Sequence, residues 1–128
     1  MIQAYFAHIK ATIDKYAAAN FVLDSHVSFE TRPGNQGYVH GQVVFVDKSR
    51  LFFREYLDAI TEQVDKLMYT YHYQDASAQL LFRYDNAQHK PALLFTGHKH
   101  LGDTEVIQAD APALTDVLAE IAQRQEWI

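Results

Sequence analysis

The residues best suited to chemistry are gathered in one short part of the chain, residues 83–100. Three of the seven histidines lie there, with three basic side chains and one carboxylate, so this segment carries +2 in a chain of net charge −5. The set consists of Arg83, Asp85, His89, Lys90, His98, Lys99 and His100. A cationic, histidine-rich segment on an acidic protein predicts a binding site for an anionic substrate.

Two kinds of chemistry use such a set of side chains. Without a metal, one histidine removes a proton, a second protonates the leaving oxygen, and Lys or Arg stabilises the charge on phosphate, which suffices for RNA cleavage by its own 2′-hydroxyl. In the alternative, His98 and His100 bind a divalent cation, with His89 and Asp85 nearby. If residues 98–100 are extended, both imidazoles share one face and Lys99 lies opposite. Because the chain has no cysteine, such a site would use nitrogen and oxygen ligands only.

A predicted hairpin at residues 66–85 places further polar side chains beside this segment. Pairing Asp75 with Ala78 predicts three facing pairs on its apolar side: Tyr73 with Leu80, Tyr71 with Phe82, and Tyr69 with Tyr84. We interpret this tyrosine stripe as core and not as a platform for stacking bases. The polar side then carries Thr70, His72, Arg83 and Asp85. These have structural alternatives, because an Arg83–Asp85 ion pair and a packed His72 are both common on strands.

The hydrophobic pattern predicts two helices around an antiparallel sheet. Helical spacing runs through residues 1–20, ending at Asn20, and again from the predicted N-cap Asp110 to about residue 125. Alternation predicts strands at 21–30, with Leu23 on the core side, and at 38–46, 50–60, 66–74, 79–85 and 104–108. The short connections indicate a meander. We therefore expect an α+β fold, a curved antiparallel meander sheet of five to seven strands with an N-terminal and a C-terminal helix packed on one face.

Composition narrows the class of protein. The 128 residues suit one domain, 1–128, and the 16 acidic against 11 basic residues exclude a generally basic nucleic-acid coat. No run approaches the ~18 apolar residues that a membrane span needs, and residues 1–15 do not resemble a signal peptide. Without cysteine the simplest location is the cytoplasm. We expect no cofactor, and exposed edge strands make a homodimer reasonable.

Three runs of sequence resemble the TumE family of small prokaryotic toxins. They are Tyr71-His72-Tyr73-Gln74-Asp75, Leu81-Phe82-Arg83-Tyr84-Asp85-Asn86-Ala87 and Phe95-x-x-His98-Lys99-His100. The chain departs from the family at residues 88–90 and 96–97, where Gln88, Thr96 and Gly97 stand near positions at which the family has a proline and further histidines. The resemblance implies the toxin of a type II toxin–antitoxin pair and, as its partner, a helix-turn-helix antitoxin encoded nearby.

The resemblance and the cationic segment together lead to a first hypothesis, a toxin that acts on RNA or translation, as a metal-independent ribonuclease or a translation inhibitor. The expected catalytic residues are His98, His100, His89 and Asp85, with His98 and His100 as the acid–base pair. The expected substrate-binding residues are Arg83, Lys99, Asn86 and His72, and no metal ligand is assigned.

Two alternatives stay open. The same surface could belong to a binding module without catalysis, which docks an antitoxin segment, RNA or the ribosome. It could also belong to a metal-dependent hydrolase built on His98 and His100.

Overall fold

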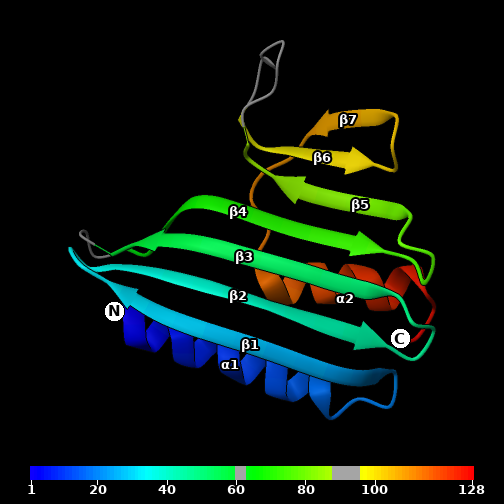
Figure 1. Cartoon of the computed structure of the whole chain (residues 1–128), viewed down its shortest axis with the longest axis horizontal. Coiled ribbons are helices and arrows are strands. Elements are labelled where there is room, and N and C mark those ends of the chain that lie inside the picture. The colour runs from blue at the N-terminus through cyan, green and yellow to red at the C-terminus, as the bar shows by residue number, and fades with distance from the viewer. Residues whose placement is uncertain (60–62, 88–95) are drawn as a thin grey trace.

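The computed structural model describes residues 1–59, 63–87 and 96–128. In this part of the chain, seven strands lie between two helices in sequence order (Figure 1). The elements are α1 (Ile2–Ala17), β1 (Val22–Arg32), β2 (Gln36–Phe45), β3 (Arg50–Asp58), β4 (Asp65–Gln74), β5 (Leu80–Asp85), β6 (His98–Leu101), β7 (Glu105–Gln108) and α2 (Leu114–Arg124).

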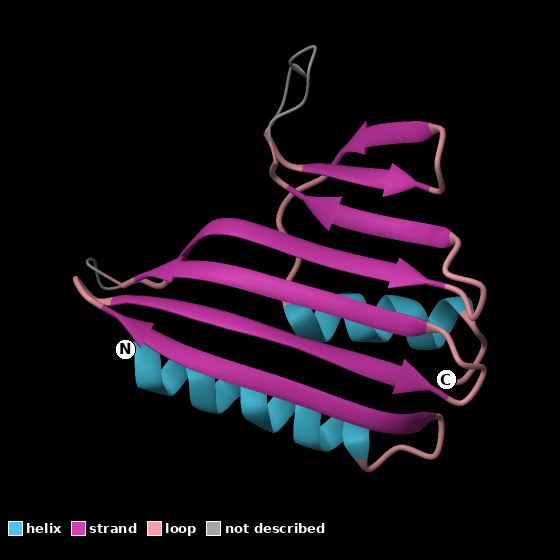
Figure 2. Cartoon of the chain, viewed as in Figure 1, coloured by secondary structure: helices cyan, strands magenta, loops and turns pink. Residues whose placement is uncertain are grey.

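The strands form one antiparallel sheet in which each strand lies beside its predecessor in the chain, from β1 to β7. Short connections favour this order because they join strands that are already neighbours. Both helices lie on the same side of the sheet, here called the helix face (Figure 2). The other side, which no described helix covers, is called the open face. The predicted α+β meander with two terminal helices is confirmed, with seven strands.

The helices form where apolar residues recur at helical spacing. In α1, Phe6, Ile9 and Ile13 are buried on one side of the helix. The buried residues of α2 follow the same rule: Leu114, Val117, Leu118, Ile121 and Ala122. None of the helices in the described residues has the length and hydropathy that a membrane span requires.

The predicted start of the second helix is wrong. Asp110 is not the N-cap, because α2 begins only after Ala113, whose N–H donates to Asp116 Oδ2 at 3.0 Å. Upstream, Lys66 Nζ donates to the carbonyl of Pro112 at 2.6 Å. This hydrogen bond from Lys66 in β4 holds the Pro112 carbonyl just before the helix. The Asp116 side chain accepts the N–H of Ala113 and so caps the N-terminus of α2.

The core lies between the sheet and the two helices. Its buried sheet residues come from β2 to β5: Val39, Val43, Phe45, Leu51, Phe53, Leu57, Tyr69, Tyr71, Tyr73 and Phe82. The interpretation of the tyrosine stripe as core is therefore confirmed. Because side chains alternate across a strand, the residues between these positions lie on the open face.

A carboxylate is also buried on the helix face. Glu55 accepts hydrogen bonds from the hydroxyls of Tyr5, at 2.5 Å, and Tyr71, and Lys66 Nζ lies 3.5 Å from Glu55 Oε2. Burial, followed by the nearby Glu55 charge, raises the pKa of both tyrosines, and burial lowers the pKa of Lys66. This polar network ties β3 and β4 to α1.

Two local registers differ from those predicted. In the β4–β5 hairpin, Tyr71 pairs with Tyr84 and Tyr73 with Phe82. The connection is wider than expected because the Asp75 carboxylate accepts the N–H groups of residues 77 and 79, and a bulge follows at Leu81. The net shift of two residues leaves the side chains from Phe82 to Asp85 on their predicted faces. Leu80 instead pairs with Gln74 and not with Tyr73, and Leu81 packs against the core in its place, against prediction.

The second difference lies in β1, where the register shifts between Val22 and Asp24. A bulge inserts an unpaired residue and so changes which side of the sheet the neighbouring side chains occupy. Leu23 is 52% exposed and does not join the core, against prediction.

Candidate functional site

The register of β4, β5 and β6 aligns polar side chains in two rows across the open face. In one row Thr70 pairs with Asp85, and Asp85 pairs with His98. In the other, His72 pairs with Arg83, and Arg83 pairs with His100. Residues paired directly across antiparallel strands share a face, so the two rows lie side by side on the open face.

Asp85 is the centre of the first group, here called the Asp85 cluster and made of Arg83, Asp85, His98 and His100. Arg83 Nε donates to Asp85 Oδ2 at 2.7 Å, and His98 Nε2 contacts Asp85 Oδ1. His100 Nε2 lies 3.6 Å from Asp85 Oδ2. The backbone N–H of Ala87 also donates to Asp85 Oδ1, at 3.3 Å. One buried carboxylate therefore holds three side chains from two strands.

His98 is fixed on both sides of its ring. Its Nδ1 lies 2.9 Å from the Thr96 carbonyl oxygen, its Nε2 faces Asp85, and the side chain is fully buried. The chain reaches this position through Gly97, where an added Cβ would lie 2.5 Å from the Ala109 carbonyl oxygen. A side chain at residue 97 would push the segment away from Ala109, so glycine suits the close approach that aligns β6.

The same cluster has the composition of a metal site. One ligand atom from each of Asp85, His98 and His100 lies within 4.8 Å of the other two. Two imidazoles and a carboxylate suit Zn²⁺ and other first-row transition metals. Metal-binding histidines commonly hold their other ring nitrogen against a backbone carbonyl, as His98 Nδ1 does with the Thr96 carbonyl. These three residues could therefore hold a divalent cation.

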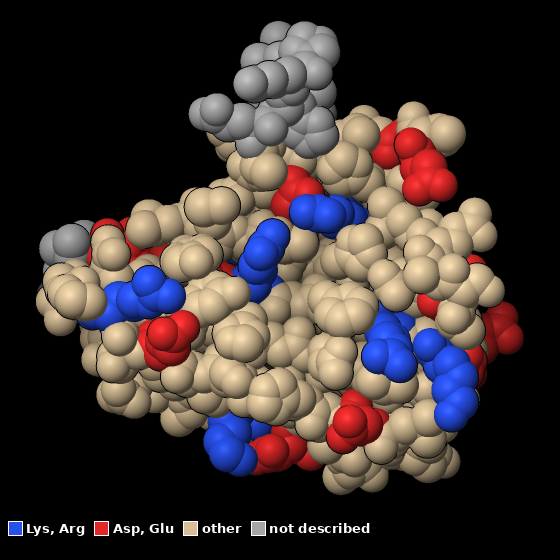
Figure 3. Space-filling view, in the orientation of Figure 1, with Lys and Arg blue, Asp and Glu red and all other residues tan. Residues whose placement is uncertain are grey.

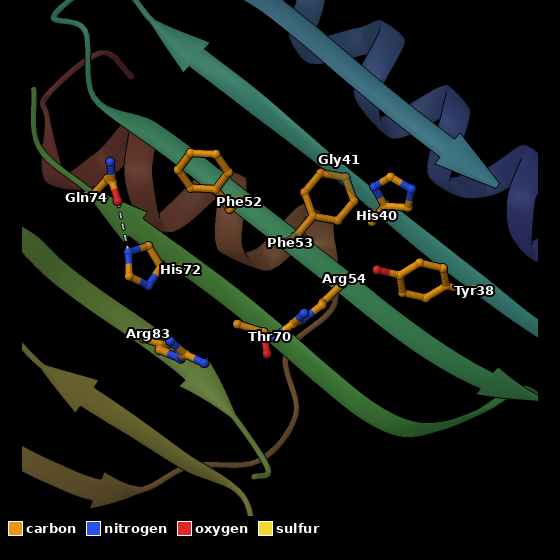
Figure 4. Close-up of a pocket in the computed structure, with 10 residues that line it drawn as sticks. All are labelled: Tyr38, His40, Gly41, Phe52, Phe53, Arg54, Thr70, His72, Gln74 and Arg83. Atoms are coloured by element: carbon orange, nitrogen blue, oxygen red, sulfur yellow. Dashed lines mark hydrogen bonds between the residues drawn. The ribbon is translucent and has the colours of Figure 1, made fainter. Parts of the chain in front are cut away.

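A cavity of about 410 Å³ lies beside the cluster on the open face (Figure 4). We call it the cationic pocket. It is lined by Tyr38, His40, Gly41, Phe52, Phe53, Arg54, Thr70, His72, Gln74 and Arg83. Two arginines and two histidines face it, and no carboxylate is among these lining residues. Basic side chains are also visible over the middle strands in the space-filling view (Figure 3). The pocket therefore suits an anion.

His72 is the titratable group whose surroundings favour a proton acceptor. Burial lowers its pKa, the nearby Arg83 charge acts in the same direction, and the hydrogen bond with Gln74 opposes them. His72 Nε2 lies 3.1 Å from Gln74 Oε1, so Nε2 carries the proton and Nδ1 is the acceptor. The second ring nitrogen points away from Gln74 (Figure 4). His72 is therefore a neutral imidazole with one nitrogen ready to accept a proton.

Other residues of the predicted site lie elsewhere. Lys99 is on the helix face, where its Nζ lies 2.7 Å from Glu120 Oε2 and 4.8 Å from the ring centre of Tyr84. Asn86 is bound to the backbone of β4, since it donates to the Leu67 carbonyl at 3.0 Å and accepts the Tyr69 N–H at 3.1 Å. His89, and Lys90 beside it, fall outside the described residues.

The sequence interpretation missed three residues that line the cationic pocket, Arg54, His40 and Tyr38. A signal for Arg54 was present. In β3 every second side chain from Leu51 to Leu57 is buried, which leaves Arg54 on the open face. For His40 and Tyr38, which lie in β2, the strand pattern predicts the face of the sheet but not the neighbouring side chains. Those neighbours lie on β3 and β4, and only the pairing of strands brings them close.

Among curated proteins and among solved structures, no match was found. The family model described as toxin TumE matches residues 10–125, a range that includes the cationic pocket and the whole Asp85 cluster. The chain belongs to the TumE toxin family.

Proposed function

We propose that this toxin acts in the cytoplasm by cleaving RNA at the open face, without a metal ion. The observation that carries the proposal is the row in which Arg83 lies between His72 and His100 on three adjacent strands. Neighbouring strands lie about 4.8 Å apart, so the two histidine backbones are about 10 Å apart. A phosphate bound to Arg83 would have an imidazole on each side.

In the proposed reaction, His72 Nδ1 takes the proton of the ribose 2′-hydroxyl. The 2′-oxygen attacks phosphorus and the bond to the 5′-oxygen breaks, which leaves a 2′,3′-cyclic phosphate and a 5′-hydroxyl. His100 supplies the proton to the departing 5′-oxygen, and Arg83 and Arg54 stabilise the charge on the phosphate oxygens. His72 suits the role of base because burial lowers its pKa and keeps it neutral.

Asp85 and His98 have a different role in this proposal. Both are buried, so they position groups that meet the substrate and do not contact it themselves. The Asp85 carboxylate orients Arg83 through Nε, and its Oδ2 lies 3.6 Å from His100 Nε2, so it also positions the imidazole proposed as the acid. Lys99 on the helix face has no part in phosphate binding.

Incubation of the purified protein with an RNA oligonucleotide tests the proposal. We expect products that end in 2′,3′-cyclic phosphate and 5′-hydroxyl, and a rate roughly 100-fold or more lower for His72→Ala. His8→Ala, an exposed histidine of α1, is the matched control and should cleave normally. RNA that stays intact contradicts the proposal, and RNA that is bound but uncut indicates the binding module without catalysis.

One observation favours a second candidate, a metal-dependent hydrolase centred on Asp85, His98 and His100. The metal would polarise the phosphate or activate water. Elemental analysis of protein purified without a histidine tag distinguishes the two. Stoichiometric metal together with loss of cleavage in chelator supports the hydrolase, and full cleavage in chelator excludes it.

Membership of a toxin family also implies an antitoxin, which we propose to be a small helix-turn-helix protein encoded beside the toxin. Expression with and without that neighbour tests the pairing. Growth arrest by the toxin alone and normal growth with both proteins would support it. Growth that is normal in both cases would contradict it.

A further inference from the structure

We infer that two tyrosines of the open face, Tyr38 and Tyr56, form a stacking platform for a base of single-stranded RNA. The inference rests on the proposed function and names the form of RNA that the site takes. It begins from a second set of aromatic rings, which is separate from the buried tyrosine stripe of the core.

The rings of this set are held parallel across two strands. Tyr38 of β2 pairs with Tyr56 of β3, and their ring centres lie 4.5 Å apart at an interplanar angle of 24°. His40, two residues after Tyr38 in β2, extends the stack: its ring centre lies 5.1 Å from that of Tyr38, also at an interplanar angle of 24°. Arg32 lies over both tyrosines, with its Cζ 5.7 Å and 6.0 Å from their centres.

The platform lies on the surface. Tyr56 is 37% exposed, and no described helix covers the open face, so its ring is available to a partner. Cross-strand aromatic pairs stabilise a sheet, and this accounts for the pairing of the two tyrosines. It does not account for the two hollows that continue from the platform. Those hollows supply the second argument.

The two hollows lie side by side and share residues. A cavity of about 290 Å³ is lined by Tyr56, Met68, Tyr69, Arg54 and Thr70. Arg54 and Thr70 also line the cationic pocket, which has Tyr38 at one end and His72 with Arg83 at the other (Figure 4). A groove therefore runs across the open face from the tyrosine platform to the proposed reaction centre.

The chemistry of this groove fits one strand of nucleic acid. Neither cavity has a carboxylate among its lining residues, and Arg54 and Arg83 lie along its length. Glu30, the acidic residue nearest in register to Tyr38, is paired with Arg32 at 3.4 Å. Arginines beside the strand and aromatic rings under its bases are the common plan of single-strand binding. Paired bases in a duplex cannot offer a face to the platform.

Binding of a labelled single-stranded RNA, measured by fluorescence anisotropy, tests the inference. The RNA carries 2′-O-methyl groups, because a blocked 2′-hydroxyl prevents cleavage during the measurement. We expect Tyr56→Leu and Tyr38→Leu each to weaken binding roughly five- to hundredfold. Phenylalanine at either position keeps the ring and should restore binding. Tyr16→Leu, in α1 on the helix face, is the matched control and should bind as the wild type does.

The outcomes separate this inference from the proposed function. Binding that prefers single strands over duplex, falls with leucine and returns with phenylalanine supports the platform. Wild-type affinity in both leucine variants, while the wild type still cleaves RNA, overturns the platform and leaves the proposed function standing. Absence of both RNA binding and cleavage in the wild type overturns the two together. Thermal melting of each variant shows whether a loss of binding comes from unfolding.

Discussion

Replacement of Asp85 by alanine removes the acceptor that Arg83, His98 and His100 share. The fully buried ring of His98 would then lose its partner at Nε2, and Arg83 would lose the bond at Nε. Breaking a buried charged pair costs about 3–5 kcal/mol. The Arg83 side chain is 33% exposed and can regain water, so we expect a loss near the lower end, about 3 kcal/mol.

The measurement is unfolding in urea, monitored by the fluorescence of Trp127. This residue is the one tryptophan of the chain, and its ring stacks on Phe21 at 5.2 Å and on Phe45 at 5.4 Å. Trp127 packs against the core and, among the described residues, makes none of the contacts of the Asp85 cluster, so its fluorescence reports the unfolding of the core. In a thermal melt, the same loss corresponds to a fall in Tm of roughly 12 °C for a domain of this size.

Two further variants make the test specific. Asp85→Asn keeps the shape and one acceptor oxygen, so it should lose about half as much stability as Asp85→Ala. Asp103→Ala removes an exposed carboxylate and should stay within about 0.5 kcal/mol of the wild type. If Asp85→Ala is as stable as Asp103→Ala, the carboxylate does not hold the cluster together and the site as described is wrong.

Three more predictions follow from single contacts. Lys99→Met breaks the ion pair with Glu120 on the helix face and should cost about 1 kcal/mol in urea unfolding while RNA cleavage stays normal; a loss of cleavage in the folded variant would place Lys99 in the site. Burial lowers the pKa of His72, so in a pH–rate profile the acidic-side midpoint of the cleavage rate should lie below pH 6.5. The hydrogen bond to Gln74 raises this pKa, so Gln74→Ala should move the midpoint lower still. An unchanged midpoint in Gln74→Ala would contradict the assignment of His72 as the base. Glu55→Gln leaves a buried amide where two tyrosine hydroxyls and a lysine meet a carboxylate and should cost roughly 2 kcal/mol, so wild-type stability in a urea melt would show that the charge is not needed.

Much of the architecture could be predicted from local pattern. Helical spacing gave both helices, and alternation gave β1 to β5, because burial of one side of an element leaves its period in the sequence. The ends of the helices and strands did not follow from local pattern in the same way. The start of α2 depends on Asp116 and on a hydrogen bond from Lys66 in β4, and a distant partner leaves no local pattern.

The candidate site shows the same division. The sequence placed Thr70, His72, Arg83 and Asp85 on one polar face, and the structure places them there although the hairpin register is shifted by two residues. The shift did no harm because side chains alternate with a period of two. The roles of these residues in catalysis stay predictions.

What the sequence by itself determined is therefore the class of fold, the polar face of the hairpin and the family of the chain. Only the tertiary structure decided that His98 is buried against Asp85, that Lys99 turns to Glu120, and that Arg54 reaches the pocket. The physical reason is the range of the interactions. A period of two or 3.6 residues is set by each element alone, whereas the neighbours of a side chain are set by strand pairing and bulges that join residues far apart in the chain.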